Sequence, residues 1–352
     1  MAFSAFPRCR NPAVRLLPQW LEKTRAFAAC LLLGIASLNA GAQAPFLYSR
    51  SAVVYDVAHG QALLEKNPDE PAPLASLTKL MTSMVVLDQH PALDEALTVD
   101  AGDIDRLKHS SSRIPVGTTL ARMEMLRLAL MSSENRSASA LSRGMAGGHS
   151  AFVVTMNGKA SALGMTGTHF EDATGLSPQN ISTARDVARM AEAASRYPLI
   201  HEFTTLSGYG VEVNGRMLHY HNSSPVLGRP GWDVLLSKTG FINEAGYCIA
   251  LEVNVQNSPV IIVLMGATSH RRRMADLVSI RSWLQGEPAP SAALLQAAYY
   301  PGRPLHHHRA RAVPHHGRFR LASYPAKPAA KIHGPGARHK AGRRNEGRVL
   351  RS

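Results

Sequence analysis

The stretch SLTKLMTSMVVLDQ, residues 76–89, carries apolar side chains at helical spacing and almost no charge. Pro71 and Pro73 hold the preceding segment extended, so the helix is expected to begin near Ser76. Apolar residues occupy nearly every face of the segment: Leu77, Leu80, Met81, Met84, Val85 and Leu87. A helix that is apolar all round is buried, so this stretch predicts a central helix with other elements packed around it.

The segments on either side predict what surrounds this helix. Residues 52–67 read as two short strands around a turn at His59-Gly60. Helical spacing recurs at 120–130, 138–145 and 152–163, and in a further helix opened by Thr183 and Asp186 as a capping box. Alternating runs fill 204–256 and 259–267, and Ser269 can cap a last helix. The pattern predicts an α+β fold, an α/β sandwich whose two chain ends share one antiparallel sheet with flanking helices, plus a helical subdomain.

The formal net charge of +14 would suit a nucleic-acid-binding protein, but it lies at the chain ends. Residues 1–42 hold five Lys or Arg against one Glu, and residues 301–352 hold thirteen against one Glu. Residues 43–300 therefore carry a charge of −2. With 45% hydrophobic and 18% charged residues, the chain is neither collagen-like, fully disordered nor a disulfide scaffold, and we expect no nucleic-acid partner.

The first 42 residues have the order of an export signal. A basic region precedes the apolar stretch Ala26–Leu38, and Ala40-Gly41-Ala42 supplies an A-x-A site. We predict a signal peptide over residues 1–42, cleaved after Ala42. A permanent membrane anchor is the alternative, but spanning needs about twenty apolar residues. Cleavage would leave Cys248 as the single cysteine, in an apolar run that predicts a buried structural thiol.

The carboxy-terminal region predicts a linker over residues 288–300 and a disordered tail over 301–352. The tail contains six Pro, six Gly and seven His besides its basic residues, so it cannot bury enough apolar surface to offset chain entropy. Two interpretations stay open. The tail adheres to an anionic wall polymer or membrane surface, or it is a solvated appendage without a ligand.

Ser76 and Lys79 stand one helical turn apart, so both side chains lie on one face at the start of the predicted buried helix. A serine hydroxyl becomes a good nucleophile when a neighbour accepts its proton, and desolvation lowers the pKa of an amine enough for that role. One Ser-x-x-Lys pair arises by chance in most chains of this length, so the pair alone indicates little.

Two further segments give the pair a chemical setting. Ser133-Glu134-Asn135 interrupts a helical region with three polar residues, and Ser133 could relay protons while the Asn135 amide binds a peptide. Lys238-Thr239-Gly240 lies in a strand pattern. There a cation and a hydroxyl suit a substrate carboxylate, and Gly240 permits close backbone approach. Together these segments resemble, in order and residue type, the S-x-x-K, S-x-N and K-T-G set of active-site-serine penicillin-interactive enzymes.

Longer stretches carry a resemblance to one family. PLASLTKLMTSMVVLD, LALMSSENRSASAL, DATGLSPQNISTARDVARM and LSKTGFINEAGYC resemble the low-molecular-mass penicillin-binding proteins, which are D-alanyl-D-alanine carboxypeptidases and endopeptidases. The resemblance covers roughly residues 48 to 287, is greatest to the penicillin-binding protein 7 type of DD-endopeptidase, and implies a β-lactamase/transpeptidase-like fold. The Ser-Glu-Asn form departs from the Ser-Gly-Asn usual in the membrane-bound carboxypeptidases.

The resemblance implies a role for each motif residue. Ser76 would be acylated, Lys79 would be its general base, and Ser133 and Asn135 would form the second catalytic motif. Lys238 and Thr239 would bind the substrate carboxylate beside Gly240, and the backbone N–H groups of Ser76 and Phe241 would form the oxyanion hole. The motifs supply no separate deacylating acid, and Glu171 and Asp172 are read as turn residues.

The resulting hypothesis is a periplasmic serine DD-peptidase domain over residues 43–287. It would hydrolyse D-alanyl peptide bonds of peptidoglycan, favouring cross-links, and be trapped by β-lactam antibiotics. The alternatives are a strict carboxypeptidase that trims terminal D-alanine and a non-hydrolytic, penicillin-binding wall sensor. No H-E-x-x-H motif occurs, so neither a metal site nor a cofactor is expected.

Overall fold

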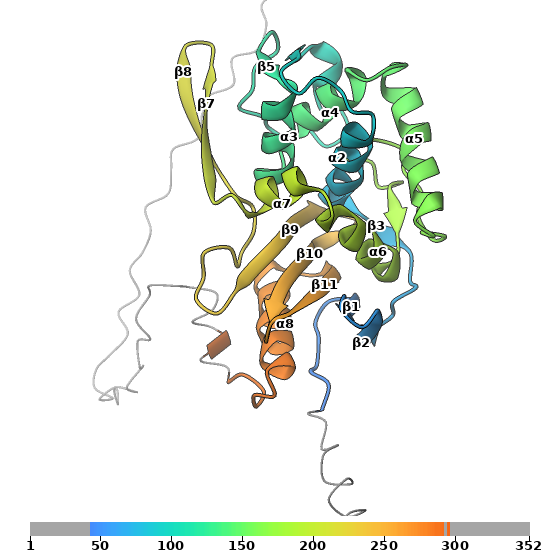
Figure 1. Ribbon diagram of the computed structural model, residues 1–352, viewed down its shortest axis with the longest axis vertical. Coiled ribbons are helices and arrows are strands. Elements are labelled where there is room, and N and C mark those ends of the chain that lie inside the picture. The colour runs from blue at the N-terminus through green and yellow to red at the C-terminus, as the bar shows by residue number, and fades with distance from the viewer. Residues whose placement is uncertain (1–42, 292–293, 296–352) are drawn as a thin grey trace, which may run out of the picture. The chain divides into compact units, whose positions relative to one another are not determined.

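The computed structural model describes residues 43–291 and 294–295 (Figure 1). The predicted signal peptide, the predicted tail and most of the predicted linker lie outside the described residues. Within the described part of the chain, no helix is long and apolar enough to cross a membrane.

The core of the fold is a five-stranded antiparallel sheet in the order β2-β1-β11-β10-β9. Its strands are β1 (Ser51–Asp56), β2 (Gln61–Lys66), β9 (Asp233–Ile242), β10 (Gly246–Val255) and β11 (Ser258–Ala267). β1 pairs with β11 from Ser51 opposite Met265 to Asp56 opposite Val260, so the two ends of the domain share the sheet. The predicted α+β class with an antiparallel sheet is confirmed.

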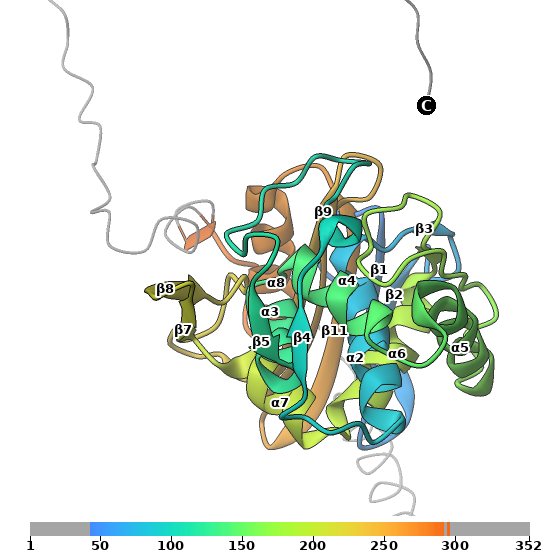
Figure 2. The same ribbon diagram turned by 90° about the horizontal axis from the view of Figure 1, so that it is seen from above.

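Alternating side chains of the strands separate two apolar cores. Ala52 and Val54 of β1 pack with α8 (His270–Leu284) on one face, whereas Val53 packs with the helical region on the other. Figure 2 shows β11 between α8 on its left and the central helix α2 (Thr78–Asp88) on its right. The hydroxyl of Ser269 accepts a hydrogen bond from the backbone N–H of Arg272, as expected of the predicted cap.

The predicted central helix is α2 (Thr78–Asp88), preceded by a 3-10 turn over Ala75–Leu77. Its residues from Thr78 to Val86 are buried. The surrounding helices are α3 (Arg122–Met131), α4 (Asn135–Arg143), α5 (Gly148–Ala162), α6 (Ala184–Ser195) and α7 (Pro198–Thr205). The apolar pattern therefore identified the centre of the helical region correctly.

Three details differ from the sequence-based expectations. α4 begins at Asn135, earlier than the predicted 138. Thr183 does cap α6, but the Asp186 carboxylate binds the backbone N–H of Gly167 instead of completing a capping box. Three successive arginines, Arg271 to Arg273, favour a solvated face, yet Arg273 is only 3% exposed and donates a hydrogen bond to the carbonyl oxygen of Cys248.

Short strand pairs connect the larger elements. β7 (Gly208–Val213) and β8 (Arg216–His221) form a hairpin that stands apart from the main sheet (Figure 1). β3 (Ala72–Pro73) pairs with β6 (Ile181–Ser182), and β4 (Ala96–Thr98) pairs with β5 (Thr119–Ala121). The first of these small sheets places the loop before β6 next to the start of α2.

Candidate active site

Ser76 lies in the 3-10 turn that leads into α2, and Lys79 lies in the first turn of α2. The Nζ atom of Lys79 donates a hydrogen bond to Ser76 Oγ at 2.9 Å. The preceding residue, Ala75, has a φ of +47°, a left-handed conformation that costs an L-residue roughly 1–2 kcal/mol. The backbone is thus held in a sharp turn where the hydroxyl meets the amine.

Lys79 is fully buried and is the central hydrogen-bond donor of the site. Besides Ser76, its Nζ donates to Asn135 Oδ1 at 2.7 Å and to the carbonyl oxygen of Thr174 at 2.6 Å. Burial lowers the pKa of Lys79 to about 8, against the opposing effect of nearby carboxylates. An amine with this pKa is partly neutral near pH 7, and its neutral form can accept a proton from Ser76.

The second motif forms the junction between α3 and α4. Ser133 has a φ of +63°, which ends the helical path, and Glu134 caps α4 by accepting a hydrogen bond from the backbone N–H of Arg136. Asn135 is the first residue of α4, and its Nδ2 atom donates to Ser110 Oγ. The polar interruption in the sequence is therefore a strained turn that points Asn135 at Lys79.

The third motif lies on β9, the edge strand of the sheet. Lys238 is fully buried, and its Nζ donates to Ser133 Oγ at 2.8 Å and to the carbonyl oxygen of Thr239 at 2.9 Å. Burial, followed by the nearby charges of Lys79 and Arg273, lowers the pKa of Lys238 well below its usual value. Thr239 Oγ1 donates to Ser223 Oγ at 2.7 Å.

Gly240 brings β9 against the turn that carries Ser76. A Cβ atom at position 240 would lie 3.1 Å from the backbone nitrogen of Ser76 and 3.1 Å from the carbonyl oxygen of Leu74. The next residue, Phe241, is half exposed and packs against Tyr247 with 4.5 Å between ring centroids. The missing side chain therefore permits the close contact expected from the sequence, and the backbones named for the oxyanion hole lie on the two segments that meet here.

A loop that sequence reasoning did not assign to the site supplies the third acceptor for Lys79. The Asp172 carboxylate accepts hydrogen bonds from the backbone N–H groups of Thr174, Gly175 and Ser177, which fixes the Thr174 carbonyl. Glu171 accepts a hydrogen bond from Ser177 Oγ. Both carboxylates therefore make turn contacts, as the sequence predicted. The one sequence feature that could have indicated the position of this loop is Gly175, because a residue without a side chain permits close approach to the turn that carries Ser76.

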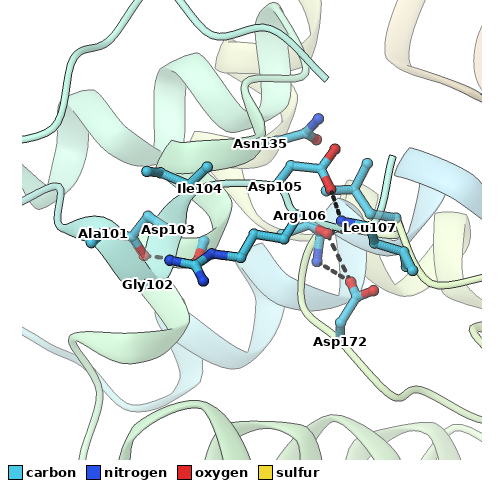
Figure 3. A pocket seen from close by; sticks show the side chains of 12 residues that line it. Ala101, Gly102, Asp103, Ile104, Asp105, Arg106, Leu107, Asn135 and Asp172 are labelled. Atoms are coloured by element: carbon cyan, nitrogen blue, oxygen red, sulfur yellow. Dashed lines mark hydrogen bonds between the residues drawn. The ribbon is translucent and has the colours of Figure 1, made fainter. Parts of the chain in front are cut away.

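A cavity of about 420 Å³ adjoins these residues (Figure 3). Asn135 and Thr174 lie on its wall, together with the segment 101–107, Ser139, Asp172 and Leu176. Within the part of the chain that the structure describes, no group of three His, Cys, Asp or Glu side chains is arranged to hold a metal ion. Cys248 is buried, and burial raises its thiol pKa to about 11.

Comparison with known proteins gives consistent matches. A family model described as D-alanyl-D-alanine carboxypeptidase, peptidase family S11, matches residues 39–269. A D-alanyl-D-alanine endopeptidase of Pseudomonas aeruginosa is 42% identical over 241 residues, which cover 68% of this chain and 78% of the relative. A D-alanyl-D-alanine endopeptidase of Escherichia coli is 38% identical over 287 residues, covering 80% and 89%. The Streptomyces K15 DD-transpeptidase structure has a TM-score of 0.65 at 24% identity and covers 69% of this chain and 99% of its own, a likeness of fold.

Proposed function

The chain belongs to the D-alanyl-D-alanine carboxypeptidase family of serine peptidases, and on that premise we propose that it cleaves D-alanyl cross-links of peptidoglycan through an acyl-enzyme on Ser76. The observation that supports this most directly is the set of contacts around Lys79. One buried amine touches a candidate nucleophile, the Asn135 amide and a fixed carbonyl.

In the first half of the reaction, neutral Lys79 accepts the Ser76 hydroxyl proton while Ser76 Oγ attacks the D-alanyl carbonyl carbon. The backbone N–H groups of Ser76 and Phe241 stabilise the negative charge on the carbonyl oxygen. Lys238 and Thr239 bind the carboxylate next to the scissile bond. Ser133, in contact with Lys238, passes a proton to the leaving amine as the carbon–nitrogen bond breaks and receives in its place the proton that Lys79 took from Ser76, so Lys79 is neutral again.

In the second half, water attacks the ester carbonyl and releases Ser76. Glu171 and Asp172 are occupied by the contacts of their own loop, so we assign proton transfer from this water to Lys79. Lys79 then passes this proton to Ser76 Oγ as the ester bond breaks, which restores the starting state. A β-lactam would acylate Ser76 by the same attack. Its leaving group stays attached, so we expect the resulting ester to be long-lived.

Peptide cross-links are the proposed substrate because the two relatives described above are named endopeptidases. The test compares a purified cross-linked muropeptide dimer with a monomeric pentapeptide, the substrate of a carboxypeptidase. We expect monomers to be released from the dimer, and Ser76→Ala to lose both this activity and covalent labelling by a fluorescent penicillin. Loss of terminal D-alanine from the pentapeptide alone would instead identify a strict carboxypeptidase, and activity of the Ser76→Ala protein would refute the assignment of the nucleophile.

Export and wall attachment are further parts of the proposal that depend on the sequence alone. We expect the mature protein to begin at Gln43, which amino-terminal sequencing of the exported protein would test.

The thirteen basic residues of 301–352 are proposed to bind anionic wall polymers or a membrane surface. Removing 301–352 should lower retention on isolated sacculi at low salt, and equal retention of the two forms would exclude adhesion to the wall.

A further inference from the structure

The segment Asn222-Ser223-Ser224 lies outside the three motifs, between the end of β8 and the start of β9. The hydroxyl of Ser223 accepts a hydrogen bond from Thr239 Oγ1 at 2.7 Å. We propose that Ser223 is a positioning residue that directs the hydroxyl proton of Thr239 toward the carboxylate of the substrate. This inference rests on the proposed function, which assigns that carboxylate to Lys238 and Thr239.

Hydrogen bonds to two helices fix the backbone of this segment. The Nδ2 atom of Asn222 donates to the carbonyl oxygens of Thr204 and Leu206, at the end of α7. The backbone N–H of Ser223 donates to the carbonyl oxygen of Met131, the last residue of α3, at 3.0 Å. Because α3 leads into the second motif, the position of Ser223 is fixed relative to that motif as well.

Two hydroxyl contacts join the same segment to β9. One is the contact of Ser223 with Thr239, and in the other Ser237 Oγ donates to Ser224 Oγ at 2.8 Å. The two contacts are alike in chemistry and differ in where they end. The Ser223 contact ends at a side chain that the proposed function places on the substrate, whereas the Ser224 contact ends one residue before Lys238.

The direction of the Ser223–Thr239 hydrogen bond decides what Thr239 can offer to a ligand. A hydroxyl carries one proton, and in the structure that of Thr239 is donated to Ser223. The distance of 2.7 Å suits a hydrogen bond in either direction, since both groups can donate and accept. When a carboxylate binds, Ser223 becomes the donor to Thr239 Oγ1, and the Thr239 proton turns to a carboxylate oxygen. Ser223 therefore acts through Thr239 and does not itself contact the substrate.

Burial makes this exchange matter most for a charged ligand. Thr239 is 9% exposed and Lys238 is fully buried, so the carboxylate would be bound away from bulk water. In such surroundings a hydrogen bond to a charged acceptor contributes more than one to a neutral acceptor. The effect of Ser223 is thus expected for ligands with a free carboxylate and not for uncharged analogues.

The test compares a penicillin that has its free carboxylate with the methyl ester of the same penicillin, which is uncharged at this position. The ratio of the two second-order acylation rate constants, free acid over ester, measures the contribution of the carboxylate. We expect Ser223→Ala to lower this ratio roughly fivefold, the effect of one hydrogen bond, by slowing the free acid alone. Ser223→Thr should restore the ratio. Ser223→Val, which has the shape of threonine without its hydroxyl, should not.

Ser224→Ala is the matched control, because it removes the other hydroxyl contact between this segment and β9. It should keep the wild-type ratio. A merely structural role of Ser223 would slow the acid and the ester equally in Ser223→Ala, and this unchanged ratio would overturn the inference. So would a Ser223→Thr protein with the low ratio of Ser223→Ala. A wild-type protein that reacts with neither compound would instead overturn the proposed function.

Discussion

The Nζ atom of Lys238 lies 2.8 Å from the Oγ atom of Ser133, which joins the edge strand β9 to the junction of α3 and α4. The two hydrogen-bond acceptors of Lys238 within the described residues are this hydroxyl and the Thr239 carbonyl, so neither carries a formal charge. Burial, and after it the nearby cations Lys79 and Arg273, lower the pKa of Lys238. Such a site is electrostatically unfavourable when empty, and an anionic group would relieve the repulsion.

Replacing Lys238 should therefore separate function from stability. In Lys238→Met, the side chain still fills its space but loses the amine, so acylation by a carboxylate-bearing penicillin should fall by about 100-fold. The unfolding temperature should stay level or rise, because a desolvated cation is removed. Acylation rates and thermal unfolding of the same preparations measure both effects. Ser237→Ala on the same strand is the control, and a Lys238→Met protein that is both inactive and strongly destabilised would contradict this account.

The lowered pKa of Lys79 predicts the pH dependence of acylation. Lys79 accepts a proton only when it is neutral, and it is protonated below its pKa of about 8. The acylation rate should therefore rise from pH 6, bend near pH 8 and level off above it. Stopped-flow labelling with a fluorescent penicillin gives this profile, and a rate independent of pH between 6 and 9 would exclude Lys79 as the base.

Glu134 should influence the pH at which the acylation rate rises, which is the acidic limb of the pH profile. Its carboxylate is among the charges that raise the pKa of Lys79, so Glu134→Gln should lower this pKa. Because the amine is then neutral at lower pH, the acidic limb shifts to lower pH and the rate at pH 7 increases. The Gln side-chain oxygen can still accept from the Arg136 N–H and preserve the cap of α4. Glu212→Gln, an exposed carboxylate on β7, should leave the profile unchanged.

Much of the fold follows from residue patterns that act locally. Near-continuous apolarity around Lys79 predicted the buried α2, and the alternating runs predicted β9, β10 and β11. Sheet membership of β1 was also predictable, because an amino-terminal hairpin needs partners for its apolar faces. By contrast, Arg273 could not be placed by its neighbours in the chain, since α8 buries it against β10 through tertiary packing.

In the candidate site, too, some features could be predicted from the sequence and others depend on tertiary packing. Residue type and spacing singled out Ser76, Lys79 and Asn135, which the structure brings together around one amine. The Thr174 carbonyl gives no side-chain signal, because any residue type supplies a backbone oxygen. Its position depends on the Asp172 turn and on the conformation at Gly175, which only the folded loop reveals.

Gly175 provides the test of that loop. It has a φ of +82°, and a Cβ atom there would lie 1.9 Å from the carbonyl oxygen of Ala75. Gly175→Ala must therefore move either this loop or the turn that carries Ser76. We expect the substitution to lower the free energy of unfolding by at least about 3 kcal/mol, the combined effect of the left-handed conformation and the steric overlap. Acylation should also fall more than tenfold at temperatures where the protein stays folded, since both acceptors of Lys79 on these segments shift.

Gly117 supplies the matched control for this substitution. It also has a positive φ, +88°, but a Cβ atom there would meet nothing within 4 Å. Gly117→Ala should therefore lower the free energy of unfolding only by the conformational strain, roughly 1–2 kcal/mol, and leave the acylation rate unchanged. Urea unfolding and penicillin labelling of the two variants separate strain from overlap. If Gly175→Ala acylates as fast as Gly117→Ala, the Thr174 carbonyl is not needed to position Lys79.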